Sequence, residues 1–185
     1  MSQYYLMAQL PSLDCVGDTA PLPITEERFY ELCHRFLGKK ATGILEALTL
    51  APARDGAAVR SPLVEAFNTY ERQLRLALGL ARAAKLQKPF DAGDASIPAS
   101  VQQTANTAVS MDDPLAAEAF LSQLRLEHLE SLRPGDAFSE EAVFYYGLKL
   151  KLLSRMRQFD ESRGQAAYQT IYDSILHQDK QEATE

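Results

Sequence analysis

The sequence predicts an all-α protein, a single-domain helical bundle of about five to seven helices. Apolar residues recur at three- and four-residue spacing along most of the chain, and no stretch shows the strict alternation of a strand. Residues that favour helix N-caps stand before several of these stretches. The chain has 185 residues, 46% of them hydrophobic and 24% charged, which suits one globular domain. We expect residues 1–177 to form that domain and residues 178–185 to be a frayed polar tail.

The beginning of the chain holds one ambiguous segment and two predicted helices. Residues 4–10 are apolar but too few for periodicity to decide between a short strand and a helix. A loop over residues 11–23 separates them from a helix that starts after Thr25, a good N-cap residue. Gly38 is placed to end this helix as its C′ residue, and a second, short helix covers residues 42–50.

The longest helix is predicted to open at Ser61 and Pro62, because serine is a good cap and proline suits the first helical position. A mobile linker is predicted over residues 87–96, which include Pro89, Gly93 and two aspartates, and a weaker helix follows over residues 99–110. The apolar stripe of the longest helix consists of Leu63, Phe67, Tyr70, Leu74, Ala77 and Ala81, and the residues expected to face away from it are Glu65, Asn68, Arg72, Arg75 and Arg82.

The last three predicted helices include the centre of the bundle. One starts at Asp113 and Pro114 and runs to about Ser131; it is apolar on two sides, so neighbours should cover both. The next, capped by Ser139 and ending near Gln158, has so wide an apolar arc that we expect it to be the central helix. Its polar strip is predicted at Gly147, Lys151, Ser154 and Gln158, and a final helix beyond residues 159–160 carries a narrow stripe of Tyr168, Ile171, Tyr172 and Ile175.

No catalytic, cofactor-binding or metal-binding residue is predicted. The three histidines, at positions 34, 128 and 177, stand far apart and match no metal-ligand spacing. Residues 38–43, GKKATG, differ from a phosphate loop in the order of their residues and follow a predicted helix rather than a strand. Acidic pairs stand at predicted helix starts, where the helix dipole stabilises them. The net charge of −6 disfavours a nucleic-acid partner.

The protein is expected in the cytoplasm. No Lys or Arg precedes Arg28, whereas a secretory signal starts with a positively charged region. No apolar run is long enough to cross a bilayer, so direct membrane insertion is not expected. Cys15 and Cys33 are the only cysteines and lack the pattern of a disulfide framework, so we expect both to be reduced.

Lys149 is the charged residue whose position needs an explanation, because it lies inside the apolar arc of the central helix. Its stem can cover apolar neighbours while the ammonium group reaches water. Alternatively, it forms an ion pair with a carboxylate of the preceding helix, Glu118 or Glu127, or with a partner protein. The sequence leaves these interpretations open.

Both ends of the chain contain segments in a familiar order. The first are Tyr4-Tyr5-Leu6 and Leu10-Pro11; the others are Asp113-Pro114-Leu115, Leu124-Arg125, residues 135–138, Tyr146-Gly147-Leu148-Lys149-Leu150, Leu153, Arg155, Phe159-Asp160 and Gly164. Together they resemble a bacterial family of unassigned function that is encoded among the subunits of V-type (A-type) ATPases. The opening residues are also similar to the start of the V-type ATPase component that seats the central stalk on the membrane rotor, which is called C in bacteria and d in eukaryotes.

The resemblance implies a non-catalytic structural or assembly component of a bacterial V-type ATPase, such as a central-stalk or socket protein. Its partners would be rotor, stalk or membrane-ring subunits, and it would lie at the membrane only through the ATPase. The component that seats the stalk is a helical funnel of three similar units, for which this chain is too short. Two alternatives stay open: a helical adaptor for an unrelated partner, and an enzyme or small-molecule binder whose pocket only the fold reveals.

Overall fold

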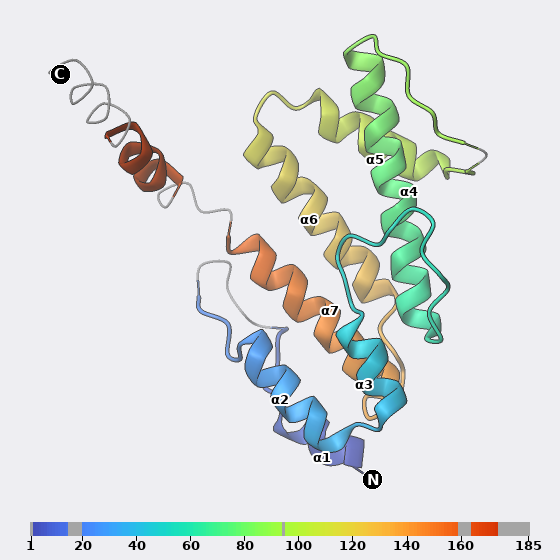
Figure 1. Cartoon of the computed structure of the whole chain (residues 1–185), viewed down its shortest axis with the longest axis vertical. Helices are drawn as coiled ribbons and strands as arrows, with labels where there is room; N and C mark the ends of the chain where they lie inside the picture. The colour runs from blue at the N-terminus through green and yellow to red at the C-terminus, as the bar shows by residue number, and fades with distance from the viewer. Residues whose placement is uncertain (1, 15–19, 94, 159–163, 174–185) are drawn as a thin grey trace, which may run out of the picture.

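The computed structural model describes residues 2–14, 20–93, 95–158 and 164–173. Within these ranges the protein is all-helical and has no strand, which confirms the predicted fold class (Figure 1). Seven helices and an eighth over residues 164–173 exceed the predicted five to seven, because the ambiguous first segment is itself a helix. The seven are α1 (Ser2–Gln9), α2 (Glu26–Phe36), α3 (Lys39–Glu46), α4 (Pro62–Lys85), α5 (Ala99–Ser110), α6 (Pro114–Ser131) and α7 (Glu140–Met156).

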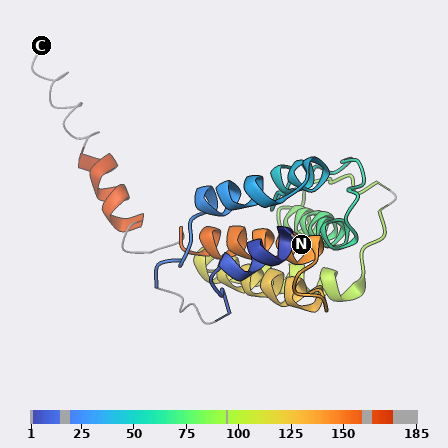
Figure 2. The same ribbon diagram turned by 90° about the horizontal axis from the view of Figure 1, so that it is seen from below.

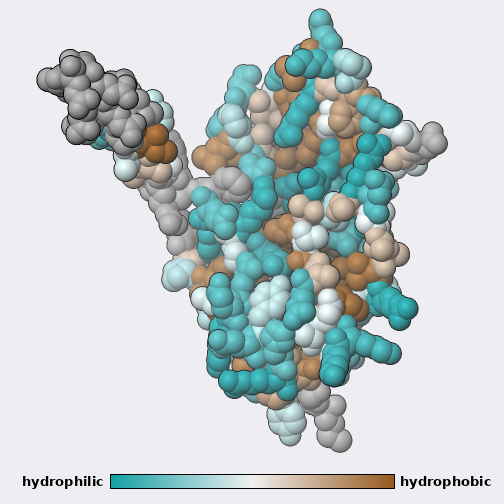
Figure 3. All heavy atoms as spheres, viewed as in Figure 1, coloured by the Kyte–Doolittle hydropathy of each residue, from teal (hydrophilic) through white to brown (hydrophobic). Residues whose placement is uncertain are grey.

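Helix α7 is the centre of the bundle, as its wide apolar arc predicts. Every residue from 142 to 150 is buried, and α2, α3, α4 and α6 all pack against this helix. Figure 2 shows α7 between α2 and α3 on one side and α6 on the other. A second apolar cluster lies between α4 and α5, with Leu121 of α6 added to it. On the face seen in Figure 3, hydrophobic side chains lie in small groups between hydrophilic ones.

The predicted N-caps set the starts of four helices. The side-chain oxygens of Thr25, Ser61, Asp113 and Ser139 each accept a hydrogen bond from a backbone N–H in the first turn of α2, α4, α6 and α7. Ser61 is also tied to α7, because its hydroxyl donates to Glu141 Oε2 at 2.7 Å. The start of α4 is thereby attached to the central helix.

Three local predictions are wrong. Gly38 follows the C-cap residue Leu37 and so holds the predicted C′ position of α2, but its φ of −75° is not left-handed, and it is also the N-cap of α3. Helix α3 therefore begins at residue 39 instead of 42. Asn68 is buried in α4 instead of facing away from the core, and Gly147 is buried in α7 instead of lying on a polar strip. Gly147 lies against Phe29 of α2 and Leu48 after α3, which cover a side of α7 that its sequence pattern predicts to be polar.

The helix over residues 164–173 and the linker between α4 and α5 are the remaining parts of the described chain. Residues 164–173 are helical, as predicted, and all exposed; this helix stands apart from the others in Figures 1 and 2. Ile175, the tail 178–185 and Cys15 lie outside the described residues. The linker over residues 87–96 has no helix, and its predicted mobility stays a prediction. No described helix combines the length and the apolar character that a membrane span requires.

Candidate functional site

Lys149 lies where the N-terminal segment, the end of α6 and the middle of α7 meet. Its side chain is only 9% exposed, and its Nζ contacts Asp14 Oδ1 and Glu130 Oε1, each at 2.5 Å. Arg133 flanks the same carboxylates, at 3.1 Å from Asp14 Oδ2 and 3.7 Å from Glu130 Oε2. We call these four residues the Lys149 cluster. It joins residues that are up to 135 positions apart in the sequence.

The predicted partners of Lys149 are not the observed ones. Glu127 lies one turn before Glu130 on α6 and accepts a hydrogen bond from Gln123 on the surface. Glu118 lies farther from the cluster along α6 and pairs with Arg155 at 2.8 Å. The sequence places the acidic partner on the right helix but cannot set the register between α6 and α7 to within one turn.

The electrostatics of the cluster favour ion pairs rather than proton transfer. The hydrogen bond from Lys149 lowers the pKa of Asp14. Burial alone would raise the pKa of Glu130, but hydrogen bonds from Lys149 and Tyr145 outweigh it and lower that pKa. Burial also opposes the charged form of Lys149, yet both carboxylates raise the pKa of its ammonium group above the ordinary value. Lys149 therefore stays protonated near neutral pH and cannot serve as a general base or nucleophile.

Aromatic side chains from α1 and from the turn before α7 form an exposed surface. The ring of Tyr4 stacks on Phe138, with centroids 4.5 Å apart, and Tyr5 lies edge-on to Tyr4. Tyr4, Tyr5 and Phe138 are 56%, 62% and 45% exposed, and we call them the aromatic surface. Because aromatic residues are enriched in protein interfaces, these three exposed rings are the candidate contact surface of the described chain.

Contacts of residues 3–11 with the core hold the aromatic surface in place. Leu6 of α1 is fully buried in the core cluster that also contains residues of α2 and α7, whereas Tyr4 and Tyr5 stay exposed. Gln3 donates from Nε2 to Glu140 Oε1 at 2.9 Å, and Tyr146 donates from its hydroxyl to the carbonyl of Pro11 at 2.8 Å. A hollow of about 180 Å³ lies between residues 7–14 and residues 133–149. The first helix is thus attached to the start and middle of α7.

A second group of buried charges was missed by sequence reasoning. Glu71 of α4 is fully buried, and its Oε1 accepts from Arg125 Nε of α6 at 2.8 Å. Arg125 Nη1 also lies 3.6 Å from Glu118, which pairs in turn with Arg155 of α7. Burial raises the pKa of Glu71 despite the attraction of Arg125. Glu71 lies within the apolar stripe of α4, four residues after Phe67. This position in the stripe is the sequence feature that could have predicted its burial.

Cys33 and His128 are packed into the fold, whereas His34 is exposed and lies 3.6 Å from Glu46 Oε1. Cys33 is buried, and this burial raises the pKa of its thiol to about 12, so the nucleophilic thiolate is not accessible. His128 stacks on Tyr70 with ring centroids 3.9 Å apart, and burial lowers the pKa of its imidazole. Within the described ranges, no three His, Cys, Asp or Glu side chains lie close enough together to hold a metal ion. Comparison with protein-family models, with curated proteins and with solved structures finds no match for this chain.

We expect Lys149→Met to destabilise the protein by about 1–2 kcal/mol at pH 7. The loss is limited because the side chains of Asp14 and Glu130 are 43% and 39% exposed and keep Arg133 as a partner. Their lowered pKa values give stability that is present above their ordinary values of 3.8 and 4.5 and lost as the pH falls through the folded values. The difference from the parent in urea melts should therefore shrink in acid, and a constant difference would contradict this account.

Proposed function

We propose that the protein is a non-catalytic component of a bacterial V-type ATPase that contacts rotor, stalk or membrane-ring subunits through the aromatic surface. The observation that supports it is the meeting of the segments that carry the resemblance. Residues 4–6, the turn over residues 135–138 and residues 146–150 are far apart in the sequence, yet they lie together at the junction of α1 with α7. Residues 146–150 and Leu6 are buried there, and the exposed members Tyr4, Tyr5 and Phe138 share one surface, which is consistent with one interface.

The chemistry of this junction supports the non-catalytic part of the proposal. The positive charges of Lys149 and Arg133 balance the negative charges of Asp14 and Glu130 in the fold. The exposed side chains Tyr4, Tyr5 and Phe138 are aromatic, and aromatic rings bind by burial and stacking rather than by proton or group transfer. This arrangement suits a contact that orients one protein of an assembly on another.

The test is purification of the tagged protein from its native host, followed by mass spectrometry of what accompanies it. ATPase subunits should be recovered with the parent protein. The double variant Tyr4→Ser with Phe138→Ser should recover at least about tenfold less, because truncating aromatic anchors at an interface removes about 2 kcal/mol or more. Both rings are exposed, so the variant should keep the helical circular dichroism of the parent.

Leu86→Ser is the matched control, since Leu86 is 64% exposed and follows α4 at the opposite end of the bundle from α1 (Figure 1). This change should leave the recovery of ATPase subunits unaltered. A preparation without any ATPase subunit, from cells that express the ATPase, would overturn the proposal. Recovery of unrelated proteins that depends on Tyr4 and Phe138 would favour the helical adaptor instead.

A further inference from the structure

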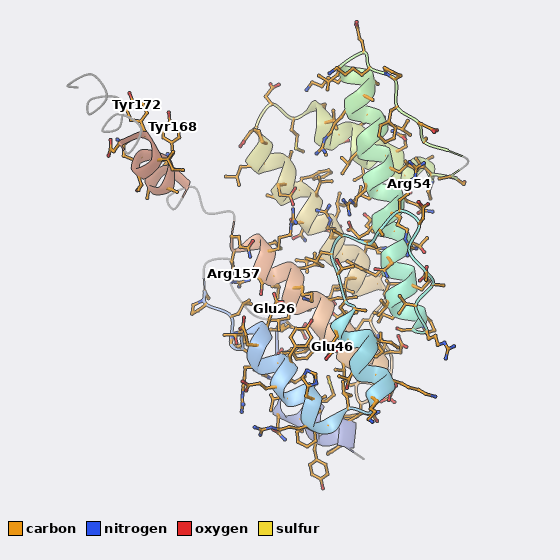
Figure 4. All side chains as sticks on the ribbon, in the orientation of Figure 1. Glu26, Glu46, Arg54, Arg157, Tyr168 and Tyr172 are labelled. Carbon is orange, nitrogen blue, oxygen red and sulfur yellow. The ribbon has the colours of Figure 1, made fainter. Side chains whose placement is uncertain are left out.

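A hollow of about 450 Å³ lies on the outer side of α4, away from the aromatic surface. The loop over residues 51–54 forms one rim, the linker around Phe90 forms another, and α4 forms the floor. Three arginines line it, Arg54, Arg72 and Arg75, and we call it the arginine hollow. Figure 4 shows Arg54 beside α4. None of the described lining residues is acidic, although the whole chain has a net charge of −6.

The three arginines differ in how their charges are compensated. Arg72 pairs with Glu65 at 3.0 Å and donates from Nε to the carbonyl of Ala53, so it holds the loop against α4. Arg54 donates to the carbonyl of Asp91 at 3.3 Å, which ties the loop to the linker without neutralising the guanidinium. Arg75 is exposed, and in the described part of the chain neither it nor Arg54 forms an ion pair with a carboxylate. Arg54 and Arg75 thus line the hollow without an ion pair among the described residues, although Arg75 attracts the more distant Glu71.

The apolar side of the hollow is built around a glycine. A Cβ atom on Gly79 would lie 2.6 Å from Phe90 Cζ, so the ring rests on the bare backbone of α4. Phe90 remains 44% exposed, and Leu76 and the buried Pro52 continue the apolar lining. The hollow therefore places an aromatic ring beside two guanidinium groups that form no ion pair among the described residues.

We propose that the arginine hollow binds an acidic segment of a partner protein, with a carboxylate side chain on Arg54 and Arg75 and a neighbouring apolar side chain against Phe90. Guanidinium groups bind carboxylates through paired, charge-assisted hydrogen bonds. The hollow opens to solvent between its two rims, whereas small-molecule pockets enclose most of their ligand. An open trough with charge at one side and an aromatic ring at the other suits an extended peptide chain.

Binding is tested by fluorescence anisotropy with short labelled peptides in which Glu alternates with Leu or Phe, and with counterparts in which Gln replaces every Glu. The acidic peptides should bind at least about tenfold more tightly than the Gln peptides, because charge-assisted hydrogen bonds contribute about 1.5–3 kcal/mol. Arg54→Gln and Arg75→Gln should each weaken binding by about tenfold. Phe90→Ser should weaken binding of both kinds of peptide, since the ring contributes contact rather than charge.

Arg60→Gln is the matched control, because Arg60 is an exposed arginine on the same loop but outside the lining of the hollow. It should leave the affinity unchanged. Equal binding of acidic and Gln peptides, no binding of any peptide, or loss of affinity in Arg60→Gln as large as in Arg75→Gln would overturn the proposal. Binding to anionic phospholipid vesicles without binding to acidic peptides would overturn it too, and would assign the arginines to a membrane surface. These measurements use no ATPase component, so their result is independent of the function proposed above.

Discussion

Replacing Arg125 by Met is expected to destabilise the protein by about 3–5 kcal/mol, the largest effect that we predict for any single charge. Glu71 is fully buried between α4 and α6, and Arg125 is its hydrogen-bond partner. Methionine keeps much of the volume of the arginine stem but cannot pair with the carboxylate. The unpaired Glu71 must then bury a charge or take up a proton, and both cost free energy at pH 7.

A double variant separates this cost from lost packing. Combining Arg125→Met with Glu71→Gln should recover most of the stability, because no buried carboxylate is then left unpaired. Arg28→Met is a matched control, since Arg28 pairs with Glu31 where both side chains are more than half exposed, and it should cost less than about 1 kcal/mol. Urea melts of the four proteins at pH 7 measure these differences. An Arg125→Met cost as small as that of Arg28→Met would refute the importance of the pair.

The pH dependence of the Arg125→Met variant follows from the same carboxyl group. Burial raises the pKa of Glu71 in the native protein, and loss of Arg125 raises it further. A carboxyl whose folded pKa exceeds its unfolded value of 4.5 gives stability below that value and loses it as the pH rises through the folded pKa. The deficit of Arg125→Met relative to the parent should therefore be greatest at neutral pH and smaller near pH 5. The deficit of Lys149→Met also shrinks in acid, but for a different reason: there the parent loses stability as its carboxylates are protonated, whereas here the variant regains it.

Gly147→Val is expected to cost about 3 kcal/mol, the second large effect, because this glycine marks the closest packing around α7. A Cβ atom there would lie 3.0 Å from Leu48 Cδ1 and 3.1 Å from Phe29 Cε1, both buried side chains of the core. Valine adds two further methyl groups that must displace α2 or the residues after α3. Thermal and urea melts of the variant measure the loss.

Gly43 of α3 provides the control for this prediction, since no atom lies within 4 Å of a Cβ built there. Gly43→Ala should stabilise the protein by up to about 1 kcal/mol, the ordinary gain of replacing glycine within a helix. Gly147→Ala should not show that gain, because the packing cost offsets it. A stabilised Gly147→Val variant would show that α2 can move away from α7 without penalty, which would contradict the close packing.

The aromatic surface and the arginine hollow could not have been assembled from the sequence. Tyr4 and Tyr5 are separated from Phe138 by more than a hundred residues, and the contact of Tyr4 with Phe138 depends on Leu6 entering the core. Arg72 and Arg75, which α4 contributes to the hollow, were expected on a solvent face, and this is correct for Arg75. The loop that brings Arg54 beside them has no periodic pattern. Long-range contacts of loops leave no local trace in a single sequence.

By itself, the sequence determined the helices after the ambiguous first segment, their order and most of their ends. Local rules set these features, because a cap such as Ser61 or Ser139 bonds to its own first turn and an apolar arc such as that of α7 requires neighbours on several sides. Tertiary structure alone decided which charges pair: Lys149 with Glu130 and Asp14 rather than Glu118 or Glu127, and Glu71 with Arg125. The physical reason is register, since sliding one helix past another by a single turn exchanges every partner while leaving each helix pattern unchanged.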